Sequence, residues 1–224
     1  EWVRRVHLDL VGAIPPLETV EAFLKDRDPA KRTKLIDDLL DNPGYVRNWT
    51  TIWSNLLIGR QTPRRVSRTG MRKFLREAFA KNRPWDKIVF DLVSAEGHFE
   101  RNGAVNYLLA QMTMRDEGVQ ATAKTTRLFM GIQVQCTQCH NHPFNEWRQE
   151  QFHGLTAFFK STRSRSVRDG DAFELISGSF DGSPYYEDRQ GVLHVAPAGL
   201  RGQRVDLKGN QNPRGELARL MTGD

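Results

Sequence analysis

The sequence predicts a mainly α, multi-helix domain followed by a small β appendage near the C-terminus. Apolar residues recur at helical spacing in seven segments before Lys160, and Pro and Gly residues separate several of these segments. Beyond Lys160, short strand-like runs lie between clusters of Gly, Pro and Asp. We therefore expect a helical domain over residues 1–165 and a β-containing extension over residues 166–224.

The first 60 residues are expected to be helical, beginning with the run over residues 4–10. Pro16 suits the first turn of a helix, the pair Asp28-Pro29 opens a second, and residues 42–44 separate it from a third. The third helix has an aromatic stripe, which is more often part of a core than the lining of a cofactor pocket. Its apolar positions are Tyr45, Trp49, Trp53, Leu56 and Leu57.

Four more helices are predicted before Lys160. A basic, turn-rich segment over residues 60–70, most simply a solvated loop, leads to a fourth helix that ends near Pro84. The others are expected from Asp86 to Gly97, over residues 119–135 and over residues 147–159. The stretch 161–165 is expected to be a polar, flexible link. After this stretch we expect strands over residues 172–176, 191–197 and 203–207, followed by a helix from residue 214.

Composition places the chain among globular proteins. Of its 224 residues, 38% are apolar and 27% are charged, which is enough apolar material for a real core. The formal net charge is +6, which suits an acidic partner or an anionic surface but predicts no nucleic-acid binding. No apolar run is long enough for a transmembrane segment. Because the chain begins at Glu1 without a methionine, we expect an internal piece whose export signal lies upstream.

The segment Cys136-Thr137-Gln138-Cys139-His140 holds both cysteines of the chain and matches the attachment motif of c-type haem. Two thiols three residues apart on one turn can each add to one vinyl group of the same porphyrin. His140 then lies under the iron and can donate an imidazole nitrogen as the proximal ligand. The sequence therefore predicts haem c, with Cys136 and Cys139 as the attachment residues.

Three alternatives to haem remain open. Cys136, Cys139, His140 and His142 could bind zinc or non-haem iron, although structural zinc sites usually separate their two ligand pairs by about a dozen residues. The cysteines could instead form a redox-active dithiol, although no βαβ context surrounds them. They could also form a plain structural disulfide.

The distal ligand of a haem iron is not determined by any spacing in the sequence. His153 is our first choice, because it lies thirteen residues after His140 and can return to the opposite side of a ring. The other candidates for the distal ligand are Met130, Met112, Met114, His98 and His7. His142 is too close to His140 to reach the other face, so we expect a second-site or propionate contact there. Arg127 and Arg148 flank the motif and could pair with propionates.

Four groups of residues resemble a planctomycete-type surface cytochrome-like domain of unknown function. They are Arg5-x-His7-Leu8-Asp9-Leu10-x-Gly12-x-Ile14-Pro15-Pro16, Leu39-Leu40-Asp41-Asn42-Pro43-x-Tyr45, Asn82-Arg83-Pro84-Trp85-Asp86, and the run from Phe129 through the motif to Phe159. The resemblance covers roughly residues 1–165, and residues 214–218 are similar to the start of a companion domain. It implies a large exported bacterial protein, often encoded near genes for polymer breakdown, with no established reaction.

Together these features predict a haem-binding, electron-transfer domain of a larger exported protein, located in the periplasm or at the cell surface. The expected partners are a redox protein or other haem domains. The alternative is a non-haem metal-binding module or metal-dependent enzyme that adds Glu146 or Glu150 to the Cys and His cluster. No nucleophile elbow, Walker loop or carboxylate pair is present, so the sequence identifies no catalytic residue.

Overall fold

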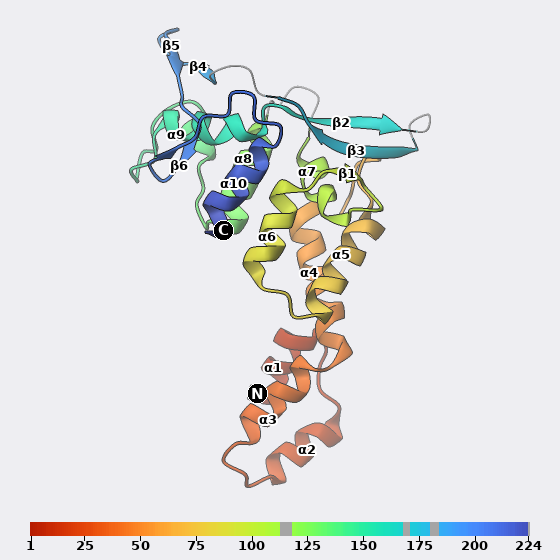
Figure 1. Cartoon of the computed structure of the whole chain (residues 1–224). Helices are drawn as coiled ribbons and strands as arrows, with labels where there is room; N and C mark the ends of the chain where they lie inside the picture. The colour runs from red at the N-terminus through yellow and green to blue at the C-terminus, as the bar shows by residue number, and fades with distance from the viewer. Residues whose placement is uncertain (113–117, 168–170, 180–183, 224) are drawn as a thin grey trace.

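The computed structural model describes residues 1–112, 118–167, 171–179 and 184–223. Helices make up most of this part of the chain, and small antiparallel sheets follow near the C-terminus, so the predicted fold class is confirmed. Figure 1 shows an elongated molecule with three N-terminal helices at one end and the strands at the other. These three helices are α1 (Trp2–Val11), α2 (Leu17–Lys25) and α3 (Lys31–Leu40).

The N-terminal helices have clear local signals at their ends. Gly12 ends α1 with a left-handed φ of 71°, a conformation that glycine adopts without a Cβ penalty, and its N–H donates to the carbonyls of His7 and Leu8. The ring of Trp2 stacks on that of Phe23 with centroids 5.4 Å apart, which joins α1 to α2. None of the residues of α2 is fully buried, so this end contributes little to the core.

The main core is built around four helices: α4 (Pro43–Ile58), α5 (Arg68–Ala80), α6 (Trp85–Ser94) and α7 (Asn106–Gln111). Side-chain caps begin two of them, because the Asn42 side chain accepts from the N–H of Gly44 at 2.7 Å and Ser67 accepts from that of Gly70 at 3.0 Å. Helix α7 and the preceding 3₁₀ turn η1 (Gly103–Val105) were not predicted. Their residues over positions 103–109 are all buried, so no polar face marks a helical period.

Helix α8 (Val119–Phe129) is shorter than the helix predicted over residues 119–135. Gly131 adopts a left-handed φ of 68°, and the N–H groups of Met130 and Ile132 both donate to the carbonyl of Thr126. These bonds close the helix before the motif. The next helix, α9 (Gln149–Thr156), continues into the 3₁₀ turn η3 (Ala157–Phe159), close to the predicted range.

The largest sheet is antiparallel in the order β1 (Gly97–His98), β3 (Ala172–Ser177), β2 (Thr162–Val167). The expectation of a flexible link at residues 161–165 was wrong, because most of it is β2. As an edge strand, β2 exposes four of its six residues and lacks hydrophobic alternation. Its Arg165 instead forms an ion pair of 2.6 Å with Glu174 on β3.

Shorter hairpins and a final helix complete the chain. Strand β4 (Tyr185–Glu187) pairs with β5 (Leu193–Val195), and β6 (Gly199–Leu200) pairs with β7 (Gln203–Arg204). The strand predicted over residues 172–176 is present as β3 and is one residue longer, whereas those predicted over residues 191–197 and 203–207 are shortened to β5 and β7. Helix α10 (Pro213–Thr222) packs against α6 and contributes Leu217 and Ala218 to the main core. The predicted domain boundary after residue 165 falls inside strand β2, and residues on both sides of it belong to one core. The division of the chain into two domains therefore stays a prediction.

Candidate functional site

The cysteine motif lies in the connection between α8 and α9, on the side of the molecule that also carries α10 (Figure 1). Cys136 belongs to the 3₁₀ turn η2 (Gln135–Gln138), and Cys139 follows it directly. Both thiols are free and exposed. Because residues i and i+3 eclipse each other in a 3₁₀ turn, the two side chains are placed on the same side of the backbone.

The first two turns of α9 hold the motif in place. The carbonyl oxygen of Gln138 accepts from Gln149 Nε2 at 3.2 Å and from His153 Nε2 at 3.1 Å. The side-chain oxygen of Asn141 accepts from the N–H of Gln149 at 3.0 Å. Buried Thr137 adds a local bond from its hydroxyl to the carbonyl of Val134. The roles of Asn141 and Gln149 were not predicted, since no spacing rule connects an Asx side chain to a helix eight residues later.

We expect Asn141→Ala to lower the free energy of unfolding by about 1 kcal/mol, the usual cost of removing a side-chain acceptor from a helix N-terminus. Asn141→Asp is the matched control, because it keeps the acceptor oxygen and adds a charge that the helix dipole favours. Urea unfolding of both variants measures the difference. Equal stability of the alanine variant and the unchanged chain would show that this bond contributes nothing.

The His140 ring is partly buried and is oriented by a hydrogen bond to the neighbouring main chain. Its Nδ1 lies 2.6 Å from the carbonyl oxygen of Asn141, so Nδ1 carries the proton and donates. In the neutral ring this leaves the lone pair on Nε2. Metal-ligating histidines usually donate their second ring N–H to a carbonyl or carboxylate in this way. His140 therefore has the tautomer that coordination through Nε2 requires.

His142 has a different arrangement. Its Nδ1 accepts from the N–H of Phe144 at 3.1 Å, which uses the free lone pair of the neutral ring. Its backbone N–H donates to the carbonyl of Trp147 at 2.8 Å and closes the loop that leaves the motif. The geometry gives His142 a structural role in this loop, and its predicted second-site or propionate contact stays a prediction.

His153 is half-buried beside the motif and begins a stack of three rings. It lies parallel to Tyr186 with centroids 4.5 Å apart, and Tyr186 stacks on His194 at 5.2 Å. Burial lowers the pKa of His153, an effect that the bond to Gln138 opposes and the charge of Lys160 reinforces. The neutral ring, donating from Nε2, has its lone pair on Nδ1. The prediction that His153 is the distal ligand thus requires bonding through Nδ1 or loss of the Gln138 bond.

The methionine candidates lie among core side chains. Met130 follows α8 and lines a narrow crevice with Leu155, Phe159 and Met221. Met112 follows α7 and packs partly buried against the main core. Both positions suit the alternative that these methionines fill gaps in the core, and their predicted role as distal ligands stays a prediction. Met114 lies outside the described residues.

Charged residues surround the motif at the surface. Arg127 in the last turn of α8 and Arg148 before α9 are both exposed, as are Glu146 and Glu150. Glu150 lies 3.9 Å from Arg204 on β7. Over the described ranges, no three His, Cys, Asp or Glu side chains converge as a metal-binding group.

The fold and the motif together define a mainly α protein that presents a Cys-x-x-Cys-His turn at its surface. The chain belongs to the PSCyt2 family, described as a protein of unknown function (DUF1549), whose model matches residues 1–164. This confirms the resemblance to a planctomycete surface cytochrome-like family. The similarity of residues 214–218 to a companion domain stays a prediction. Comparisons with curated proteins and with solved structures found no match.

Proposed function

We propose that this chain carries one covalently attached haem c and transfers electrons within a larger exported protein. The observation that carries the proposal is the state of His140. Its Nδ1 donates to the carbonyl of Asn141, which leaves Nε2 with the lone pair that a proximal ligand needs. Cys136 and Cys139 would hold the porphyrin, and the haem supplies a one-electron iron couple when bound.

The surroundings of the two thiols support covalent attachment. Both are free and exposed, so a porphyrin can approach them without opening the core. Phe144, four residues after His140, exposes 91% of its surface, which is unusual for a phenylalanine. An apolar porphyrin face beside the motif would give this ring a partner. The exposed guanidinium groups of Arg127 and Arg148 suit the propionates at the rim.

Export and redox partners follow from the same chemistry. Thioether attachment takes place outside the cytoplasm, and the chain has no cysteine other than the two in the motif. The family name, which describes a surface cytochrome, supports a periplasmic or cell-surface location. None of the described helices combines the length and the apolar character needed to cross a bilayer. A net charge of +6 suits an acidic redox partner or a neighbouring haem domain.

The test is to express the chain with an export signal in a host that attaches haem c, and to extract the purified protein with acidified acetone. We expect the haem to stay with the protein and to give the pyridine haemochrome spectrum of a doubly linked haem. The double variant Cys136→Ser/Cys139→Ser should release all haem. His140→Ala should keep the covalent bond but change the Soret and visible bands, because the proximal ligand is lost.

Two outcomes would contradict the proposal. In the first, the unchanged chain contains no haem, although a control cytochrome produced in the same cells has its haem attached. In the second, the bound haem is fully extractable. If such a chain retained zinc or iron in stoichiometric amount without a Soret band, the alternative of a non-haem metal-binding module or metal-dependent enzyme would be supported. Metal analysis of the same sample makes that distinction.

A further inference from the structure

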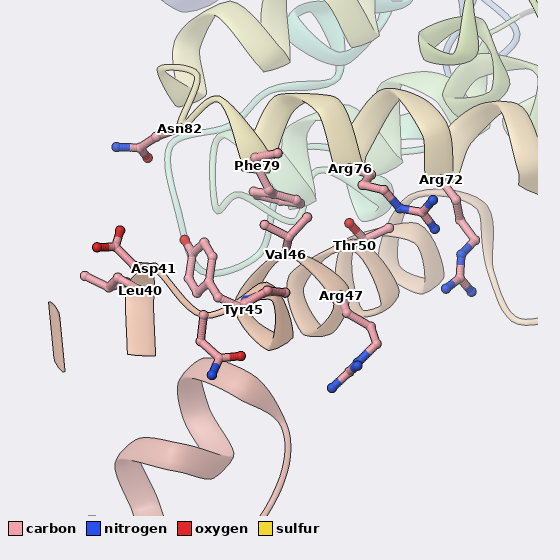
Figure 2. A pocket seen from close by; sticks show the side chains of 13 residues that line it. Leu40, Asp41, Tyr45, Val46, Arg47, Thr50, Arg72, Arg76, Phe79 and Asn82 are labelled. Atoms are coloured by element: carbon pink, nitrogen blue, oxygen red, sulfur yellow. The ribbon is translucent and has the colours of Figure 1, made fainter. Parts of the chain in front are cut away.

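A cavity of about 730 Å³ lies between α4, α5 and the turn before α4. It is distant in sequence from the motif, and Figure 1 places these helices in the middle of the molecule, between the N-terminal helices and the strands and away from α9. Figure 2 shows the side chains that line it, which come from both helices and from the turns at their ends. This volume is within the range of pockets that bind small molecules.

One end of this cavity is positively charged. Arg47 comes from α4, and Arg72 and Arg76 come from successive turns of α5 that face it. Within the described part of the chain, none of the three guanidinium groups forms an ion pair or a hydrogen bond. Three arginines near one another without acidic partners repel each other, and a bound anion would remove that repulsion.

Thr50 is the second observation at this end. It lies on α4, one turn after Val46, and only 1% of its surface is exposed. Its hydroxyl is buried and has no hydrogen-bond partner among the residues that the structure describes, although most buried hydroxyls have one. Figure 2 shows the hydroxyl between Val46 and Arg76, on the side of the cavity. The oxygen of this hydroxyl is almost inaccessible, so a ligand oxygen reaches it only after a small shift of a neighbouring side chain, and would then satisfy both the hydroxyl and the nearby guanidinium groups.

The rest of the cavity is of a different character. Figure 2 shows Tyr45, Val46 and Phe79 between the arginines and a polar end formed by Asp41 and Asn82. The two aromatic side chains offer an apolar surface on which a flat ring can lie. The carboxylate of Asp41 disfavours an anion at its own end. The cavity therefore distinguishes the two ends of a ligand.

We propose that this cavity is a binding site for a small anionic ligand that carries a carboxylate, sulfate or phosphate group on a ring-shaped body. The anionic group lies among Arg47, Arg72 and Arg76 and accepts a hydrogen bond from Thr50. The ring lies against Tyr45 and Phe79. This site is separate from the motif, so its existence does not depend on haem attachment.

Calorimetric titration of the whole chain with three probes tests the proposal: phenyl phosphate, phenyl sulfate and benzoate. At least one is expected to bind with a dissociation constant below about 1 mM, and inorganic phosphate, which lacks the ring, about tenfold more weakly. Phenol, which lacks the charge, should show no measurable binding. The relative affinities of the three probes identify the preferred anion. The proposal is overturned if none of the three binds, or if phenol binds equally well.

Variants distinguish this cavity from non-specific binding to a basic protein. Arg72→Gln should weaken the best probe at least about tenfold, because a charge-assisted bond is lost. Lys73→Gln removes the same charge from the next position of α5, does not line the cavity, and should leave the dissociation constant unchanged. Equal weakening by both variants would mean that net charge alone attracts the probe.

Thr50→Val provides a second, independent readout. Valine has nearly the shape of threonine without the hydroxyl, so it removes a buried polar group that has no partner in the described part of the chain. We expect the melting temperature to stay the same or rise, while the best probe binds about fivefold more weakly or worse. Unchanged affinity would exclude the hydroxyl from the site. A fall in melting temperature would show that the hydroxyl stabilises the chain without a ligand.

Discussion

Replacing Arg214 by alanine should lower the free energy of unfolding by about 3–5 kcal/mol, one of the two largest effects that we predict. Arg214 lies at the start of α10 and is fully buried. Its guanidinium group donates to the carbonyls of Val93 at 3.1 Å and Ala95 at 2.7 Å, and to the Ser177 hydroxyl at 2.8 Å. Alanine would leave these buried acceptors without donors and open a cavity among α6, α10 and β3.

The charge of Arg214 is maintained in spite of its burial. Burial lowers the pKa of Arg214 to about 10, and the carboxylate of Glu96, 3.4 Å away, opposes this effect. The guanidinium therefore stays protonated at neutral pH and keeps all its donors. This residue connects residues 213–222 to the C-terminal end of α6, so its loss should weaken the packing of the extension on the helical domain.

Urea unfolding measures this prediction, and Arg219→Ala provides the control. Arg219 belongs to the same helix, is exposed and pairs with Glu216 at 2.6 Å. An exposed pair of this kind usually contributes less than about 1 kcal/mol. If both variants lost the same small amount, the buried contacts of Arg214 would not hold the extension to the domain. If the Arg214→Ala chain stayed folded and only α10 lost its packing, the extension would be able to separate from the helical domain.

Gly103→Ala is the second substitution for which we expect a large effect, a loss of about 3 kcal/mol or more. A Cβ on Gly103 would overlap the carbonyl of Gly70 on α5 and would lie 2.8 Å from Phe74 Cβ. The obstacle is mainly backbone, which cannot move aside as a flexible side chain would. Both glycines are buried, and they let η1 approach α5 at backbone distance. Alanine must therefore push these elements apart in the main core.

Gly178→Ala is the matched control for this substitution. Gly178 follows β3 and is exposed, and a Cβ added there would lie 3.8 Å from its nearest neighbour, the carbonyl oxygen of Ser161. We expect its stability to change by less than about 0.5 kcal/mol, as for most surface substitutions. Thermal and urea unfolding of both variants give the comparison. A Gly103→Ala chain as stable as the control would mean that η1 can shift without cost.

Local sequence signals were sufficient for most of the helices. Asn42 and Ser67 cap α4 and α5, and Gly12 ends α1, as their residue types favour. These local signals did not predict a helix that is buried on every side or a strand that lies at the edge of a sheet. Helix α7 has no polar face, and β2 has no apolar alternation, so neither shows the period on which a prediction depends.

The cysteine motif shows the same difference between what local sequence signals predict and what they do not. The spacing of Cys136, Cys139 and His140 predicts a place for haem attachment, because this chemistry depends on residues close in the chain. The spacing contains no information about Asn141 holding α9 or about His153 stacking on Tyr186. The cavity between α4 and α5 was likewise not predicted. It is lined by side chains from two helices, and only the packing of the folded chain determines which faces of these helices lie opposite each other.

The sequence by itself therefore determined the helical class, the family and the residues of the motif, since each depends on periodicity or on short-range spacing. Only the tertiary structure decided which ring nitrogen of His140 is available, how Arg214 joins the extension to α6, and where three arginines line one cavity together with Thr50. These features depend on contacts between residues that are far apart in the chain or on the orientation of a side chain. Packing of the whole core, rather than any local preference, selects those contacts.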